Sequence, residues 1–287
     1  MFLALSLGER VARKGRVRGQ LSITRANFNL TLHVHDSDDL VLVKLLLTTD
    51  HRQQTPDCQT LSMRTLRIIA AIFVKDLRLE WRHRETLASM CVFGILVVFL
   101  FNFAFESGGE ERLRLLPGLL WIAFAFSGIL GFNRSFATER ENACLEGMAL
   151  APVDPGAIYL GKMLANLVFL GIAEAVIVFA VALWYNFSFV PSLKWFTLIT
   201  FLGTLGYVAV GTIFGAIAAN TRMREVMLPV LQFPVAVPVF IAGIEATTGA
   251  LKGDAPSQYL SWINLAAGFS VIFLVLSYLL FEYVLEE

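Results

Sequence analysis

The sequence has little charge and few of the residues that build metal, redox or hydrolytic sites. Charged residues make up 16% of its 287 positions, against roughly 25% in ordinary soluble domains. Its three cysteines, Cys58, Cys91 and Cys144, share no metal-binding or redox spacing. No Ser/His/Asp or Cys/His arrangement can be placed along the chain. The sequence therefore predicts no disulfide framework, no metal site and no catalytic residues.

Hydrophobic residues are abundant instead, at 56% of the positions, with a mean hydropathy of +0.67. Six charge-poor runs are each near or above the roughly 18 residues that mark a membrane-spanning helix. They cover residues 86–105, 115–132, 163–189, 195–220, 226–244 and 260–281. These runs predict an all-α integral membrane protein with six transmembrane helices in a lipid bilayer. The net charge of zero gives no indication of a nucleic-acid partner.

The positive charges are distributed unequally between the two sides of such a bundle. Counting the connections on alternate sides gives 11 Lys and Arg residues on one side and 4 on the other. Cytoplasmic connections carry the excess of Lys and Arg in membrane proteins. We therefore expect residue 63, the connection between the second and third spans, and the C-terminal tail to be cytoplasmic.

Residues 1–62 differ in composition from the rest of the chain. They hold an Arg- and Lys-rich stretch, three of the four histidines, and a hydrophobic patch at residues 40–47. That patch is too short to span a bilayer, which takes roughly 20 residues. We expect an upstream extension that is poorly ordered or arises from the choice of start site. A small folded domain is the alternative.

An amphipathic helix is predicted just before the first span, over residues 64–85. Leu66, Ile69, Phe73, Leu77 and Trp81 recur at three- and four-residue steps, and charged residues fill the other positions. Such a pattern is typical of a helix that lies in the membrane interface. A soluble core helix is the alternative, but a membrane span follows at once.

Residues 133–162, here called the elbow, form a charged connection between the second and third spans. Residues 135–145 contain no Gly or Pro, so they predict a helix. Gly147 and Pro152 then end it, and Asp154 followed by Pro155 predicts the capped start of a second helix. We interpret this pattern as a docking element for an ATPase. The candidate coupling residues are Arg134, Glu139, Arg140, Glu141, Glu146, Gly147, Pro152, Asp154 and Lys162. The alternative is that these charges only solvate a cytoplasmic loop.

Two further features lie within the predicted spans. Glu174 is a carboxyl group in the third run, where it is either functional or a protonated side chain that hydrogen-bonds to a neighbouring helix. The fifth run contains Pro229, Pro234 and Pro238, each of which removes a backbone donor, so we expect a kinked or broken helix.

Residues 156–163 approach the pattern of a phosphate-binding P-loop. Met163 stands where Ser or Thr is needed to hold magnesium, and no strand precedes the motif. We interpret the match as chance, so any ATP that drives this protein must bind to another chain.

Residues 63–287 resemble the CcmB family, the membrane permease subunits of an ABC system for cytochrome c maturation. The resemblance is carried by Lys75-Asp76, Arg84-Glu85, Pro117-Gly118 with Trp121, residues 131–136, Glu139-Arg140-Glu141, residues 145–147, residues 151–154, Gly161-Lys162 and the three spaced prolines. The elbow pattern is also similar to the wider class of ABC-2 exporters. Residues 1–62 lie outside the resemblance.

The resemblance implies a location in the bacterial inner membrane and a set of partners. These are a cytoplasmic CcmA-like ATPase that binds the ATP, CcmC-like and CcmD-like membrane subunits, and a haem chaperone. Haem is implied only through the complex, with no cofactor held by this chain. The sequence alone leaves two function classes open, namely an ATP-driven transporter subunit and a passive membrane scaffold or channel.

Overall fold

The computed structural model describes residues 6–7, 19–25, 28–34, 58–104, 109–141, 154–186, 189–219, 221 and 223–286. The chain divides into two compact units, Met1–Thr65 and Leu66–Glu287.

The first unit contains a three-stranded antiparallel sheet that the sequence analysis did not predict. Its strands are β1 (Ser6–Leu7), β2 (Gly19–Arg25) and β3 (Phe28–Val34), in the order β1-β2-β3. Strands β2 and β3 pair in register from Gly19 opposite Val34 to Arg25 opposite Phe28. Apolar and polar residues alternate in β2, as in a strand with one covered face.

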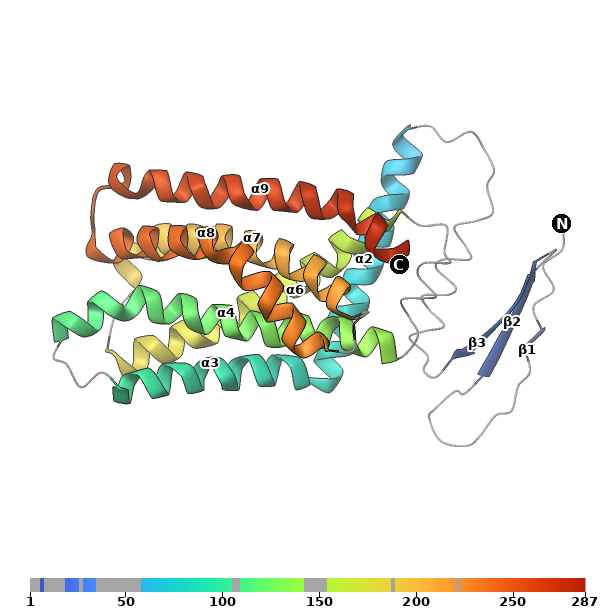
Figure 1. Ribbon diagram of the computed structural model, residues 1–287, viewed down its shortest axis with the longest axis horizontal. Helices are drawn as coiled ribbons and strands as arrows, with labels where there is room; N and C mark the ends of the chain where they lie inside the picture. The colour runs from blue at the N-terminus through green and yellow to red at the C-terminus, as the bar shows by residue number, and fades with distance from the viewer. Residues whose placement is uncertain are drawn as a thin grey trace. The chain divides into compact units, whose positions relative to one another are not determined.

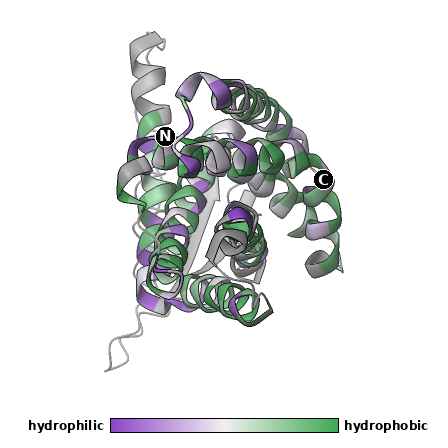
Figure 2. Cartoon of the chain, turned by 90° about the vertical axis from the view of Figure 1, so that its left-hand side faces the viewer, coloured by the Kyte–Doolittle hydropathy of each residue, from purple (hydrophilic) through white to green (hydrophobic). Residues whose placement is uncertain are grey.

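The described residues of the second unit form helices joined by turns, and six of these helices are long and apolar enough to cross a membrane, as predicted. Helix α2 comes first, and Figure 1 shows its residues 66–83 running across one end of the six long helices. Seen along the bundle, hydrophobic residues cover most of the helices (Figure 2). The helices are α2 (Cys58–His83), α3 (Glu85–Ala104), α4 (Gly109–Glu141), α6 (Pro155–Trp184), α7 (Leu193–Ala219), α8 (Arg224–Lys252) and α9 (Pro256–Glu286), with the 3-10 turn η1 (Val190–Ser192) before α7.

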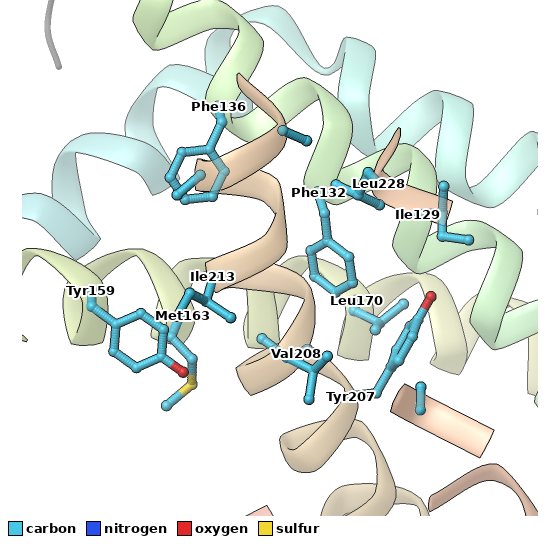
Figure 3. Close-up of a cluster of buried hydrophobic side chains, with 14 of the residues drawn as sticks. Ile129, Phe132, Phe136, Tyr159, Met163, Leu170, Tyr207, Val208, Ile213 and Leu228 are labelled. Atoms are coloured by element: carbon cyan, nitrogen blue, oxygen red, sulfur yellow. The ribbon is translucent and has the colours of Figure 1, made fainter. Parts of the chain in front are cut away.

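Helices α4 and α7 form the centre of the bundle. In each of them 72% of the most apolar segment is buried, compared with 22–39% in the other four spans. Phe132 of α4 stacks edge-on against Tyr207 of α7, with 5.4 Å between ring centroids (Figure 3). A Cβ atom on Gly211 would lie 2.2 Å from the Phe132 ring. The glycines of α7 therefore allow close packing against α4, as small residues do between membrane helices.

Helices α4 and α8 are longer or more continuous than the sequence predicted. Helix α4 continues past the predicted end of the second span as far as Glu141, so the first half of the elbow is an extension of that span. Helix α8 stays helical from Arg224 to Lys252 with Pro229, Pro234 and Pro238 inside it, and it is visibly bent in Figure 1.

Candidate functional site

The candidate site lies at the end of the bundle crossed by α2, where α4 ends and α6 begins (Figure 1). Asp154 caps α6 there, because its Oδ1 accepts a hydrogen bond from the Gly156 amide at 3.0 Å. The Tyr278 hydroxyl of α9 donates to Asp154 Oδ2 at 3.1 Å. The predicted capped start at Asp154 and Pro155 is thus confirmed, and the hydrogen bond from Tyr278 connects this cap to α9.

Helix α2 joins the bundle through a buried ion pair, here called the latch, between Asp76 and Lys162. Lys162 Nζ lies 3.4 Å from Asp76 Oδ2, and the two side chains are 1% and 11% exposed. The Lys162 ammonium also sits 4.8 Å from the centroid of the Phe136 ring. The preceding Gly161 lets α2 approach, since a Cβ atom there would lie 2.9 Å from Ile72. The Gly-Lys pair of the elbow thus forms the contact between α6 and α2.

The latch shows which side of α2 faces the bundle. The sequence pattern places Leu66 and Trp81 on the apolar face of a helix in the membrane interface, with charged residues such as Asp76 at the other positions. In the structure Asp76 and Ile72 face the bundle, whereas Leu66 and Trp81 are 61% and 72% exposed. A buried Lys on α6 attracts the carboxylate, and the exposed apolar side chains are left to the membrane interface.

The electrostatics of the latch keep Asp76 ionised. Burial raises the pKa of this carboxyl, but the ammonium groups of Lys162 and Lys75 together lower it by more. Lys75 Nζ lies 3.1 Å from Asp76 Oδ1. The pKa of Asp76 therefore lies below its ordinary value of 3.8, and the carboxylate carries a negative charge at neutral pH.

A tight turn at Arg84 joins α2 to the first span. Arg84 has a φ of 54°, in the left-handed region, and its amide donates to the Glu80 carbonyl at 2.6 Å. The Glu80 side chain, 9% exposed, accepts a hydrogen bond from the Leu87 amide at 2.8 Å. Glu80 thereby caps the N-terminus of α3 from the last turn of α2 and fixes the angle between them.

We predict that Arg84→Gly stabilises the chain, whereas Arg78→Gly destabilises it. Left-handed backbone costs a non-glycine residue about 1–2 kcal/mol, so glycine relieves this cost at position 84. Arg78 is exposed in the middle of α2, where glycine costs about 1 kcal/mol. Thermal unfolding in detergent checks the prediction, and equal shifts of the same sign for both variants would contradict it.

The other candidate coupling residues fall into three groups. Arg134 of α4 forms an ion pair with Glu85 at the start of α3, and both side chains are well exposed at 45% and 61%. Glu139, Arg140 and Glu141 lie in the last turns of α4, and their side chains are not described. Glu146, Gly147 and Pro152 lie outside the described residues. The structure therefore brings Arg134, Asp154 and Lys162 to the same end of the bundle.

Two acidic residues of this site, Asp76 and Glu80, were missed as site residues by sequence reasoning. They lie four positions apart and so share one face of α2 with Ile69 and Ile72. That spacing was the available signal, but a single sequence does not show that their partners are Lys162 and the amide of Leu87.

Deeper in the bundle, Glu174 is 5% exposed and accepts a hydrogen bond from Thr204 of α7 at 2.6 Å. Gln232 of α8 is fully buried, and its carboxamide has no hydrogen-bond partner among the described residues. The described part of the chain contains no group of three or more His, Cys, Asp or Glu residues that could hold a metal ion.

Comparison with known proteins identifies the family to which the six-span unit belongs. Residues 67–286 match the family model described as CcmB protein. The chain belongs to the CcmB family. It is 27% identical over 198 residues to heme exporter protein B of Pseudomonas aeruginosa, covering 68% of this chain and 87% of that one. It is 29% identical over 201 residues to heme exporter protein B of Rhodobacter capsulatus, covering 68% and 91%.

A third CcmB relative, heme exporter protein B of Paracoccus denitrificans, is 28% identical over 194 residues, which cover 67% of this chain and 88% of that one. The family match begins at residue 67, inside α2, and ends at residue 286, the last residue of α9. It thus includes the latch, the elbow and all six spans of the second unit.

Proposed function

We propose that this chain is the membrane permease subunit of an ABC-type complex that acts in haem delivery or haem-chaperone release for cytochrome c biogenesis. The observation that carries the proposal is the CcmB match over residues 67–286, which coincides with the six-span unit. Relatives of known name are heme exporter proteins. In this proposal haem is cargo of the complex, and the chain itself holds no cofactor.

The proposed partners follow from the same family. They are a cytoplasmic CcmA-like ATPase that binds the ATP, CcmC-like and CcmD-like membrane subunits, and a haem chaperone. The connections on one side of the bundle carry 11 Lys and Arg residues, and those on the other side carry 4. This difference supports a cytoplasmic orientation for the end that holds α2, the elbow and the C-terminus. We place the chain in the bacterial inner membrane on these grounds.

The contacts at the elbow support a route for force between the ATPase and the spans. A projection driven by a separate ATPase has to move as a rigid body with the helices it continues into. Helices α4 and α6 continue without a break from the elbow into the second and third spans. The latch holds α2 to α6, and the pair of Arg134 with Glu85 holds α4 to α3. Four helices are therefore joined at this end, and we propose that Lys162 and Asp154 act by positioning the elbow.

The elbow charges provide the test of this proposal. We predict that Glu139→Ala, Glu141→Ala or Glu146→Ala weakens ATPase association or uncouples ATP hydrolysis, with normal membrane insertion. Losing one partner of a buried interfacial charge pair costs about 2–5 kcal/mol. Gly147→Val should act likewise if the elbow reverses there through a left-handed residue. Pull-down of the ATPase and the yield of cytochrome c are measured for each variant.

A matched control is Glu282→Ala, an exposed acidic residue near the end of α9 and outside the elbow. It should leave both ATPase pull-down and cytochrome c yield unchanged. Wild-type values for all four elbow variants would remove the elbow from the mechanism.

An ABC-2 exporter subunit for another substrate and a passive scaffold are the alternative functions. Vanadate-sensitive ATP hydrolysis by the purified complex that disappears without this chain excludes the scaffold. Normal cytochrome c maturation in a strain without this chain would exclude the haem pathway but leave the exporter reading intact.

A further inference from the structure

One exposed face of α8 differs from an ordinary lipid-facing surface. It consists of Val230, Pro234, Val237, Ile241 and Glu245, which lie at steps of three and four residues and are all exposed. These five residues are called the α8 face. Val230, Val237 and Ile241 are 62%, 47% and 47% exposed, so the face is broad and mainly apolar.

Glu245 places a carboxyl group on this face within the membrane span. The predicted fifth run ended at residue 244, but α8 continues to Lys252, which brings Glu245 inside the span Val226–Lys252. Glu245 lies one helical turn inward from Gly249, which contacts Tyr259, and Tyr259 stacks on Trp195. Tyr and Trp side chains favour the membrane interface, and Glu245 lies one turn, about 6 Å, from this pair toward the middle of the span.

The prolines add backbone acceptors to the same face. Pro234 cannot donate to the carbonyl of Val230, and Pro238 cannot donate to the carbonyl of Pro234. Both carbonyls belong to exposed residues of α8. Within the described part of the chain, Glu245 also makes no hydrogen bond or ion pair. The α8 face therefore presents several acceptors, one of them a carboxyl group, and contributes no side-chain donor for them.

Lipid tails cannot supply donors, and backbone groups at membrane depth need partners from neighbouring protein. A second copy of this chain against the same face would repeat the acceptors and bring two Glu245 carboxyl groups together. Charge complementarity instead requires a helix that carries a cation at this depth.

We propose that the α8 face is the docking surface for a transmembrane helix of a different membrane protein, which places a Lys, Arg or His side chain against Glu245. The β-branched side chains of Val230, Val237 and Ile241 pack against that helix. This inference rests on the proposed function only in taking the partner to be a membrane subunit of the same complex.

Site-directed photo-cross-linking in native membranes tests the α8 face. The full chain carries p-benzoylphenylalanine at Val237 or, as a control, at Ile272, which is 62% exposed on α9. We expect an adduct only from position 237, joined to a transmembrane helix of another protein with a cation at the depth of Glu245. Glu245→Lys should lower its yield by about tenfold or more, because like charges then face each other. Reversing the partner's cation to Glu in that variant should restore the adduct.

Several results would overturn the proposal. They are adducts with lipid only, adducts with a second copy of this chain, a partner helix without a cation at that depth, or an adduct yield that Glu245→Lys leaves unchanged. Glu282→Lys near the cytoplasmic end of α9 is the charge-reversal control and should have no effect. ATPase pull-down is followed in the same samples. If the membrane adduct is absent but the ATPase still binds, the proposal for the α8 face is wrong and the proposed function stands. If the wild type does not bind the ATPase, the proposed function is wrong.

Discussion

Asp76→Leu is expected to destabilise the helical unit by about 3–5 kcal/mol, the typical effect of removing one partner from a buried ion pair. The substitution takes the carboxylate away from Lys162, whose side chain is 1% exposed. Lys162→Met should destabilise less, because Asp76 keeps Lys75 at 3.1 Å and is 11% exposed. The double variant Asp76→Leu with Lys162→Met should regain most of the loss, since apolar pairs often replace buried ion pairs without penalty.

Thermal unfolding of the four proteins in detergent gives the coupling between Asp76 and Lys162 directly. Arg78→Met is the matched control, since this cation of α2 is exposed and takes no part in the latch. Additive effects of the two single substitutions would show that the latch contributes no stability. If the latch also transmits force, the double variant should be stable but give little cytochrome c.

The latch also makes the stability of the folded chain depend on pH in the acid range. The pKa of Asp76 is lower in the folded chain than its ordinary 3.8, so the folded state favours the ionised form. Its contribution is fully present above pH 3.8 and is lost as the pH falls through the folded-state pKa. The unfolding temperature of the wild type should therefore fall as the pH is lowered below about 4. The double variant Asp76→Leu with Lys162→Met should show a smaller fall over the same pH range.

Gly203→Ala and Gly243→Ala are each expected to destabilise the bundle by about 1–3 kcal/mol, the usual effect of overpacking a core. Trp121 of α4 is 2% exposed and lies between these glycines of α7 and α8. An added Cβ atom would lie 2.2 Å from its ring at position 203 and 2.3 Å at position 243. The indole cannot move easily, because its Nε1 donates to Thr247 at 3.1 Å.

Two other glycines of the spans serve as controls for this prediction. A Cβ atom on Gly171 or Gly268 would meet nothing within 4 Å, so alanine there should be neutral or slightly stabilising. Replacing Trp121 with Leu in the Gly243→Ala background should recover part of the lost stability. Equal unfolding temperatures for all four alanine variants would show that the Trp121 contact does not limit packing.

The helical unit was largely predictable because its main signal is local. Each span needs a long apolar run to meet the bilayer, so the six helices follow from composition and length alone. The start of α6 was also predictable, because Asp154 caps the helix through an amide only two residues away. The strands β2 and β3 were missed, since their pairing depends on contacts between segments rather than on a long run.

The sequence by itself determined the six spans, the charged elbow, its capped second helix and the resemblance that the family match confirms. Only the tertiary structure decided which charges are buried and with whom. Lys162 was predicted as a coupling residue, but its pairing with Asp76 joins positions 86 residues apart. Likewise, Glu174 faces the bundle interior and Glu245 faces outward, although both lie in apolar helices. Helix rotation sets that difference, and rotation depends on how neighbouring helices pack, which is a property of the assembled bundle.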